Sequence, residues 1–188
     1  MAIAFLGWGS LIWNPGNLRM GEEWYQDGPL LPVEFARISA DKRLTLVLYP
    51  NADRVQVLWT YAHVHTLDDA IKNLAQREGT REDQVGFLST TDDTSNCQVI
   101  PEVLDEIRTW AVKKNLDAVV WTNLPFNFRE KSGEEFNESN VIDYLRGLRK
   151  KEHQKARRYI EKTPLQIMTR IRRIIEQELG WEHADSHG

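Results

Sequence analysis

Glu78 stands at a position where a helix of this sequence would place an apolar side chain. The segment 67–78 has the spacing of an amphipathic helix, and its apolar face comprises Leu67, Ala70, Ile71, Leu74 and Ala75. Steps of three and four residues put position 78 on the same face, so its carboxylate should point into the core or a cleft. Burial and the carbonyl dipoles of a helix C-terminus both disfavour a charged carboxylate, which suits an acid that takes and returns a proton.

Two other interpretations of Glu78 stay open at this point. One is a structural ion pair inside the protein, with Arg37 as a candidate partner. The other is a frayed last helical turn, which would let the carboxylate of Glu78 reach water.

A glycine loop at residues 7–11 is the second feature that could do chemistry. Gly-Trp-Gly-Ser-Leu directly follows the apolar run 3–6. Glycines there permit a sharp turn whose backbone amides face an anion such as a carboxylate. Ile12 occupies the place of the third glycine of a dinucleotide-binding fingerprint, and no Gly-Lys-Ser or Gly-Lys-Thr follows, so neither nucleotide motif is present. A plain tight turn is the alternative interpretation.

Other reactive side chains give weaker patterns. His63 and His65 share one face of an expected strand but lack a third metal ligand nearby, which favours a plain strand. Cys97 lies in a polar stretch without an evident base, which favours a free thiol. Ser10 lacks the Gly-x-Ser-x-Gly elbow of a serine hydrolase, and its hydroxyl is better suited to orient a substrate. The histidine pair is therefore weak evidence for a metal site.

The elements that would position these residues indicate an α+β fold. Strands are expected at residues 3–6, 33–39, 44–49, 55–65, 85–90 and 118–121. The three strands between residues 33 and 65 suggest an antiparallel sheet, or a small mixed or antiparallel β-barrel with flanking helices. Thr66 is the expected N-cap of the helix 67–78, and Gly79 is its expected end.

The C-terminal part of the chain is expected to be helical. A polar loop is predicted at residues 129–140, and the helical extension should begin at about residue 139. The sequence Thr163-Pro164-Leu165-Gln166 has the pattern of a capping box with proline at the first helical position, so it predicts a further helix start.

The composition is that of one globular domain. The chain has 188 residues, of which 41% are hydrophobic, and a net charge of −4, so we expect a single domain over residues 1–188 that includes the helical extension. A lone Cys97 excludes an internal disulfide. No apolar run is long enough to cross a bilayer, and the first residues lack a secretory signal. These features favour a cytoplasmic protein without a membrane partner.

Residues 146–158 form the strongest charge run. Its cations are Arg146, Arg149, Lys150, Lys151, Lys155, Arg157 and Arg158, and its one acid is Glu152. A basic helix of this kind would suit an acidic partner or nucleic acid. A solvated helix face is the preferred interpretation, because the chain overall is acidic and no recognition motif accompanies the run. Nucleic acid is therefore disfavoured as a partner.

Two segments carry a resemblance to a known family. Residues 5–16 read Phe-Leu-Gly-Trp-Gly-Ser-Leu-Ile-Trp-Asn-Pro-Gly, and residues 74–79 read Leu-Ala-Gln-Arg-Glu-Gly. The first resembles the opening strand and Tyr-Gly-Ser-Leu loop of γ-glutamylcyclotransferase-like proteins, including the ChaC-type enzymes, which often continue with Trp-Asn-Pro. The second resembles the segment that carries their catalytic glutamate. The resemblance covers residues 3–80 and fades from residue 85 onward. Trp8 stands where the family usually has tyrosine, and the strand at 57–61 lacks an expected glycine.

The resemblance implies a small barrel fold and the cleavage of a γ-glutamyl amide, as in glutathione metabolism. In this lyase or acyltransferase-type cyclisation, the α-amine of the substrate attacks its own γ-carbonyl and 5-oxoproline is released. Glu78 would be the catalytic residue, removing a proton from this amine and later delivering one to the leaving amine. The implied substrate-binding residues are Gly7, Trp8, Gly9, Ser10, Leu11 and Arg37. The reaction needs no metal and no cofactor, and the partner is a small γ-glutamyl molecule: glutathione, another γ-glutamyl peptide or a γ-glutamylamine.

Two other functions stay open at the level of the sequence. The first is a non-catalytic ligand-binding or regulatory member of the same fold. The second is an anion-binding or nucleic-acid-binding protein that uses the basic helix 146–158. The sequence also leaves open whether the chain forms a homodimer.

Overall fold

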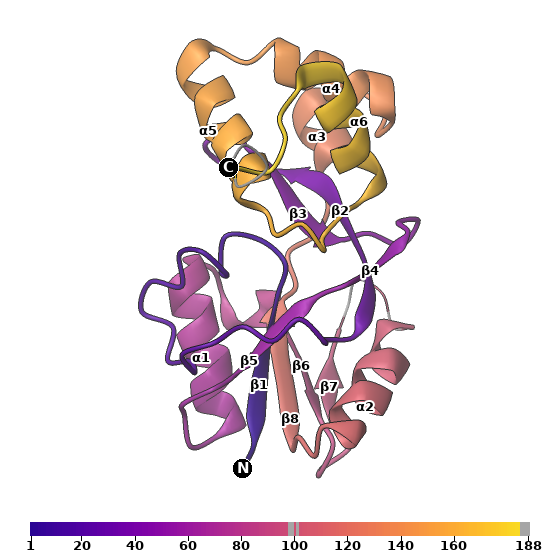
Figure 1. Ribbon diagram of the computed structural model, residues 1–188. Helices are drawn as coiled ribbons and strands as arrows, with labels where there is room; N and C mark the ends of the chain where they lie inside the picture. The colour runs from indigo at the N-terminus through magenta and orange to yellow at the C-terminus, as the bar shows by residue number, and fades with distance from the viewer. Residues whose placement is uncertain (98–99, 101, 185–188) are drawn as a thin grey trace.

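The computed structural model describes residues 1–97, 100 and 102–184, and it has an α+β architecture built on two sheets. The larger sheet contains β1 (Ile3–Gly7), β5 (Leu58–Tyr61), β6 (Val85–Ser89), β7 (Ser95–Asn96) and β8 (Ala118–Thr122), in the order β5-β1-β8-β6-β7. Strand β1 is parallel to β8 and antiparallel to β5, so this sheet is mixed (Figure 1). The expected α+β class is confirmed.

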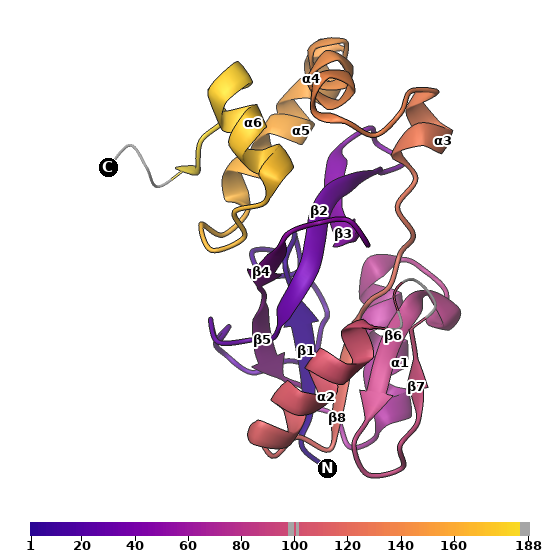
Figure 2. The ribbon, with the colours of Figure 1, turned by 90° about the vertical axis from the view of Figure 1, so that its right-hand side faces the viewer.

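Helices α1 (Leu67–Glu78) and α2 (Val103–Lys113) cover opposite faces of the larger sheet (Figures 1 and 2). Side chains alternate between the two faces along a strand, and the buried clusters follow that alternation. The side chains packed with those of α2 include Ala4, Leu6, Val119 and Trp121. The side chains packed with those of α1 include Ile3, Phe5, Ala118 and Val120. The continuous apolar runs of β1 and β8 therefore reflect burial on both faces.

The smaller sheet is antiparallel and consists of β3 (Leu44–Leu48), β2 (Leu30–Ile38) and β4 (Arg54–Gln56). The sequence predicts one strand over residues 55–65, but the chain divides there into β4 and β5 at Val57. Strand β4 pairs with β2, whereas β5 pairs with β1. The described strands thus form two open sheets instead of one closed barrel, because the chain passes from one sheet to the other at this point.

Among the described residues, four helices follow β8: α3 (Phe128–Ser132), α4 (Glu138–Arg146), α5 (Lys150–Lys162) and α6 (Arg170–Leu179). The predicted polar loop at 129–140 is wrong, because α3 and the first turn of α4 occupy part of it. Aromatic rings stabilise this segment, since Phe128 contacts both Phe136 and Tyr144 at ring-centroid distances of 5.5 and 5.8 Å.

Two other helix boundaries differ from the sequence prediction. The basic run 146–158 is not one helix, because α4 ends at Arg146 and α5 begins at Lys150. The start predicted at Thr163-Pro164 is also wrong, since α6 begins six residues later with Thr169 as its N-cap. The hydroxyl of Thr163 instead donates to the carbonyl of Tyr159 in the last turn of α5, at 3.0 Å.

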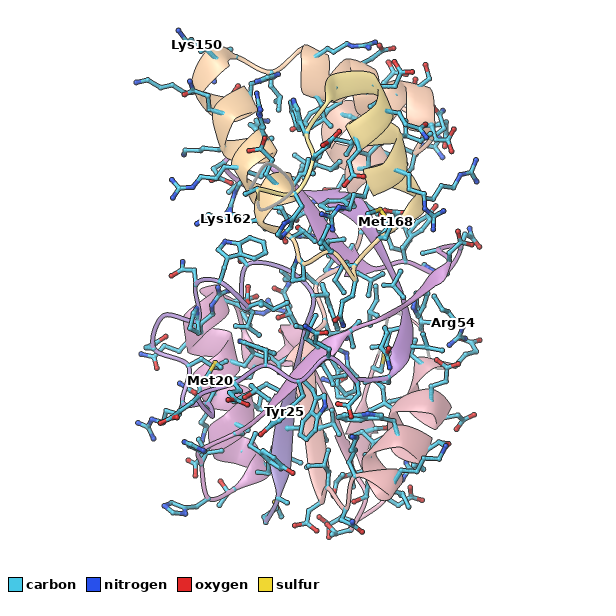
Figure 3. The ribbon with its side chains drawn as sticks, in the orientation of Figure 1. Met20, Tyr25, Arg54, Lys150, Lys162 and Met168 are labelled. Atoms are coloured by element: carbon cyan, nitrogen blue, oxygen red, sulfur yellow. The ribbon has the colours of Figure 1, made fainter. Side chains whose placement is uncertain are left out.

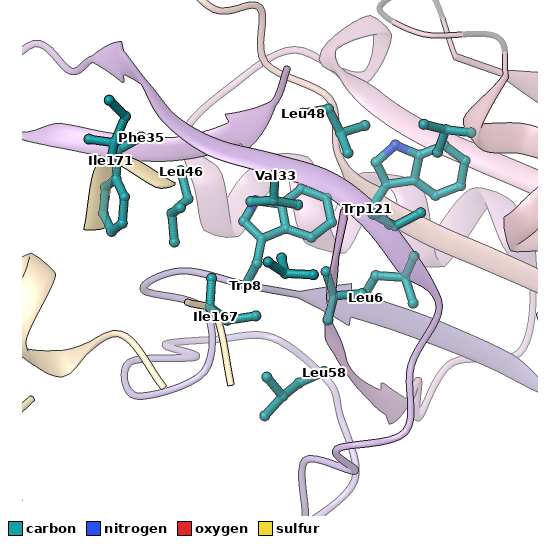
Figure 4. Close-up of a cluster of buried hydrophobic side chains, with 14 of the residues drawn as sticks. Leu6, Trp8, Val33, Phe35, Leu46, Leu48, Leu58, Trp121, Ile167 and Ile171 are labelled. Carbon is teal, nitrogen blue, oxygen red and sulfur yellow. The ribbon is translucent and has the colours of Figure 1, made fainter. Parts of the chain in front are cut away.

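The C-terminal helices share one hydrophobic core with the N-terminal strands. Figure 4 shows Ile167 and Ile171 in the same cluster as Leu6 and Trp8. Helix α6 packs on β2, and α5 packs on β3. None of the described helices is both long enough and apolar enough to cross a membrane.

Candidate active site

Helix α1 places Glu78 at the upper edge of the larger sheet. The predicted bounds of this helix are confirmed, and both caps are as expected: the Thr66 hydroxyl accepts the amide of Asp69, and Gly79 ends the helix with a φ of 63°. Because β5 is antiparallel to β1, the helix that follows β5 runs back in the direction of β1 (Figure 1). The end of α1 and the loop after β1 therefore lie at the same edge of the sheet.

A cavity of about 400 Å³ lies at this edge, and both predicted features line it. Glu78 and Gly79 form one part of the wall, and the loop 7–11 forms another. Further lining residues come from β2, β3, the turn between them, β8 and α5, and include Arg37, Arg43, Thr45, Thr122 and Tyr159. The structure thus brings together Glu78, all five loop residues and Arg37, which were singled out from the sequence.

Glu78 forms an ion pair, and its partner is Arg77. The guanidinium Nη1 of Arg77 donates to Oε1 of Glu78 at 2.6 Å, and the two side chains are only 9% and 17% exposed. The same guanidinium donates through Nη2 to Oγ of Ser10 at 3.4 Å and to the carbonyl of Asn14 at 2.5 Å. The proposed pairing of Glu78 with Arg37 is therefore wrong. Arg77 instead connects the carboxylate of Glu78 to the glycine loop through its contacts with Ser10 and Asn14.

The glycine loop is a turn with amides left available to a ligand. The amide of Ile12 donates to the carbonyl of Gly9 at 3.0 Å, and that of Asn14 donates to Ser10 at 2.9 Å. Within the described part of the chain, the amides of Gly9 and Leu11 make no hydrogen bond. Amides of this kind at a cavity wall suit an anion such as a carboxylate.

The glycines of the loop are required by packing, and neither has a positive φ. A Cβ at Gly7 would come within 2.6 Å of the Trp24 ring, and a Cβ at Gly9 would overlap the hydroxyl of Tyr159. The sequence suggested that glycine is needed here for a sharp turn, and this explanation needs correction. Gly7 and Gly9 lack a side chain because two aromatic residues approach the backbone closely.

Trp8 contributes to the cavity mainly through its position in the loop. Its side chain is only 5% exposed and belongs to the same core cluster as Val33 (Figure 4). The residue thus anchors the loop to the core while its neighbours face the cavity.

Tyr159 of α5 is a cavity residue that the sequence did not reveal. Its side chain is buried, and its hydroxyl accepts hydrogen bonds from the amides of Leu46, at 3.5 Å, and Ser10. Burial raises the pKa of Tyr159 to about 12, and the nearby charge of Glu78 acts in the same direction. In the sequence, Tyr159 falls on the apolar stripe of its helix, so it cannot be told from an ordinary core residue.

Two arginines place positive charge on the cavity wall. Arg37 is half-buried, and its Nη1 donates to the carbonyl of Pro125 at 2.6 Å. Burial lowers the pKa of Arg37 because it disfavours the charged guanidinium. An anionic ligand in the cavity would offset this effect and stabilise the charge. Arg43, which the sequence did not single out, lies over the ring of Tyr159 at 5.4 Å from its centroid. The wall is therefore suited to a ligand that carries carboxylates.

The two histidines set aside in the sequence lie just beyond β5, which ends at Tyr61. In the described part of the chain, no group of three or more His, Cys, Asp or Glu side chains is arranged to hold a metal ion.

Comparisons with known protein families, with curated proteins and with solved structures give no match to this chain.

Proposed function

We propose that this chain is a γ-glutamylcyclotransferase-like enzyme that cleaves a γ-glutamyl amide and releases 5-oxoproline. The observation that carries the proposal is that Glu78 and the loop 7–11 line one cavity. Its volume of about 400 Å³ lies in the range of small-molecule sites and suits a γ-glutamyl dipeptide. The resemblance of residues 5–16 and 74–79 to the family supports the same reaction.

The substrate's α-carboxylate would bind the amides of Gly9 and Leu11, with Arg37 adding positive charge on the wall. This contact fixes the glutamyl part, so that its α-amine lies close to its own γ-carbonyl. Ring closure gains from such orientation because both reacting groups belong to one molecule.

Glu78 would act as the proton shuttle. An α-amine is largely protonated near neutral pH, with a reference pKa of about 8, so a base must first remove a proton. The carboxylate of Glu78 takes this proton, and the amine lone pair forms the new C–N bond to the γ-carbonyl carbon. Glu78 passes this first proton to solvent, takes a second proton from the nitrogen that now closes the ring, and delivers it to the leaving nitrogen as the original amide C–N bond breaks. The products are 5-oxoproline and a free amine.

Tyr159 would donate a hydrogen bond to the γ-carbonyl oxygen as negative charge develops there. The two lone pairs of its hydroxyl oxygen accept hydrogen bonds from the amides of Leu46 and Ser10. The O–H proton therefore remains available for another partner. A fixed neutral donor of this kind stabilises an oxyanion without exchanging its own proton.

The proposed function also implies a particular type of fold and a cellular compartment. The two open sheets, joined where β4 runs into β5, would be this chain's version of the small barrel of the family. The cytoplasm, where γ-glutamyl metabolites occur with reduced thiols, is the proposed compartment.

The substitution Glu78→Gln tests the proposal. It keeps the shape of the side chain but removes the base, so we expect release of 5-oxoproline from γ-glutamyl-alanine to fall by at least about 10²-fold. The matched control is Glu82→Gln, since Glu82 is exposed in the short helix at residues 82–84 and does not line the cavity. Both variants should keep the wild-type circular dichroism spectrum.

Unchanged turnover by a folded Glu78→Gln variant would contradict the assignment of Glu78. A wild-type protein that binds γ-glutamyl compounds without forming 5-oxoproline would favour the non-catalytic member of the same fold.

The nucleic-acid interpretation has less support. Of the basic run, Arg146 pairs with Glu178, Arg149 with Glu152, and Arg157 with Glu161. These pairs reduce the free positive charge that a phosphate backbone would require.

A further inference from the structure

A second cavity of about 470 Å³ adjoins the first one. Arg43 and Tyr159 line both cavities, so they form a shared boundary. The other lining residues of the second cavity are Trp13, Asn14, Asp41, Lys155, Arg158 and Lys162. A ligand that leaves the first cavity past this boundary therefore enters the second.

The second cavity is strongly basic, because four cationic side chains face one carboxylate. Arg43 and Lys155 both contact that carboxylate, which belongs to Asp41, at 2.9 and 3.7 Å. Arg158 and Lys162 are exposed and form no ion pair with any residue that the structure describes. These two cations are available to a ligand.

One face of α5 supplies three of these four cations. Lys155, Arg158 and Lys162 are spaced by three and four residues, and Tyr159 lies among them on the same side of the helix. Figure 3 shows Lys162 at the end of α5 that approaches the larger sheet, and Lys150 at the far end. The helix therefore directs only part of its positive charge toward the second cavity.

We propose that the second cavity is a subsite for the leaving half of the substrate, and that this half carries carboxylates. The proposal rests on the cyclotransferase function, and it narrows the substrate to acidic γ-glutamyl peptides as against γ-glutamylamines. Arg158 and Lys162 bind the carboxylates of the leaving residue, while the glutamyl part occupies the first cavity beside Glu78. Arginine and lysine are the side chains that form charge-assisted hydrogen bonds to such groups.

The size and placement of the charge favour a small acidic ligand over a nucleic acid. The second cavity shares Arg43 and Tyr159 with the first, and its volume is that of a small-molecule site. Nucleic-acid binding uses many cations along the phosphate backbone. Three arginines of the basic run, by contrast, are paired with Glu178, Glu152 and Glu161.

The experiment compares three probes whose leaving halves carry two, one and no carboxylates: γ-glutamyl-aspartate, γ-glutamyl-alanine and γ-glutamyl-alaninamide. For the wild-type protein we expect kcat/KM to fall in this order. In the double variant Arg158→Gln/Lys162→Gln, the ratio of kcat/KM for the first probe to that for the last should fall about tenfold, mainly through KM. The control is Lys150→Gln/Lys151→Gln, which removes the same charge from the same helix outside the cavity and should keep the wild-type ratio.

Binding of γ-glutamyl-aspartate, measured by calorimetry, separates this inference from the proposed function. If no probe yields 5-oxoproline but γ-glutamyl-aspartate binds and the first double variant loses that binding about tenfold, the subsite stands and the catalytic proposal fails. A ratio that is the same in wild type and in Arg158→Gln/Lys162→Gln overturns the subsite. A preference for the neutral amide also overturns the subsite. Salt-sensitive binding of a single-stranded RNA oligonucleotide that depends on Arg158 and Lys162 overturns it as well.

Discussion

At the scale of single residues, the cavity depends on a close approach between Gly9 and Tyr159. The hydroxyl of Tyr159 occupies the space that a Cβ at position 9 would fill, and it accepts the amides of Leu46 and Ser10. Because its pKa is raised to about 12, this hydroxyl keeps its proton throughout the neutral range. Glycine at position 9 thus allows a neutral hydrogen-bond donor to lie against the loop.

A double-mutant cycle at these two positions tests the contact. Gly9→Ala should lower the free energy of unfolding by about 1–3 kcal/mol, because the new methyl group overlaps a buried hydroxyl. In the background of Tyr159→Phe, which removes that hydroxyl, the same alanine should have a clearly smaller effect. Urea denaturation of the four proteins measures the coupling. Additive effects of the two substitutions would show that the packing of Gly9 does not depend on the hydroxyl.

At the scale of elements, Glu34 joins the smaller sheet to α6. Its side chain lies on β2 and is only 3% exposed. The carboxylate accepts hydrogen bonds from the amide of Ile171 at 3.2 Å, from the amide of Phe35 at 2.8 Å and from the hydroxyl of Thr169. It therefore satisfies donors at the first turn of α6, where an anion is favourable. Burial nevertheless raises the pKa of Glu34 and outweighs the hydrogen bonds, which act in the opposite direction.

The raised pKa of Glu34 predicts a pH-dependent contribution to stability. Such a group stabilises the folded protein fully below its unfolded pKa, near 4.5, and loses that contribution as the pH rises through the folded pKa. The free energy of unfolding of wild type relative to Glu34→Gln should therefore decrease as the pH is raised above about 4.5. Urea denaturation of both proteins between pH 4 and 8 measures this difference, in which other titrating groups cancel. A constant difference, or one that grows with pH, would contradict the assignment.

At the scale of the whole molecule, the C-terminal helices complete both the core and the cavity. Helix α5 carries Tyr159 to the boundary of the two cavities, and α6 buries Ile171 and Ile175 against the strands. The segment between these helices adds Ile167, which is fully buried. The helices from residue 138 onward are thus part of the same packed body as the N-terminal strands.

Removal of the chain beyond Leu148 should abolish cooperative folding. The truncation deletes buried side chains at Tyr159, Ile160, Ile167, Ile171 and Ile175, each of which contributes roughly 1.5–3 kcal/mol by burial. Their sum is comparable to the entire net stability of a typical domain, about 5–15 kcal/mol. Near-ultraviolet circular dichroism and thermal unfolding of the truncated chain measure the effect. A sharp melting transition close to that of the full chain would show that the N-terminal part folds by itself.

Several elements follow from local sequence signals. The helix at 67–78 is predicted correctly because its caps, Thr66 and Gly79, form hydrogen bonds within one turn of the helix ends. The start of α6 is predicted wrongly because Thr163-Pro164 has the same local signal, while tertiary contacts of Thr169 and Glu34 decide where the helix begins. Local patterns therefore suffice where the stabilising partners are themselves local.

The sequence by itself determined that Glu78 ends an amphipathic helix and that a glycine loop follows the first strand, since spacing and capping depend on neighbouring residues. Only the tertiary structure decided what surrounds them. Arg77 is the partner of Glu78, and Tyr159 and Arg43 complete the cavity, because these contacts depend on how α5 packs on β3. A buried tyrosine on an apolar stripe has the same periodicity as any core residue, so its hydroxyl acquires a role only when a distant backbone loop, without a side chain at Gly9, lies against it.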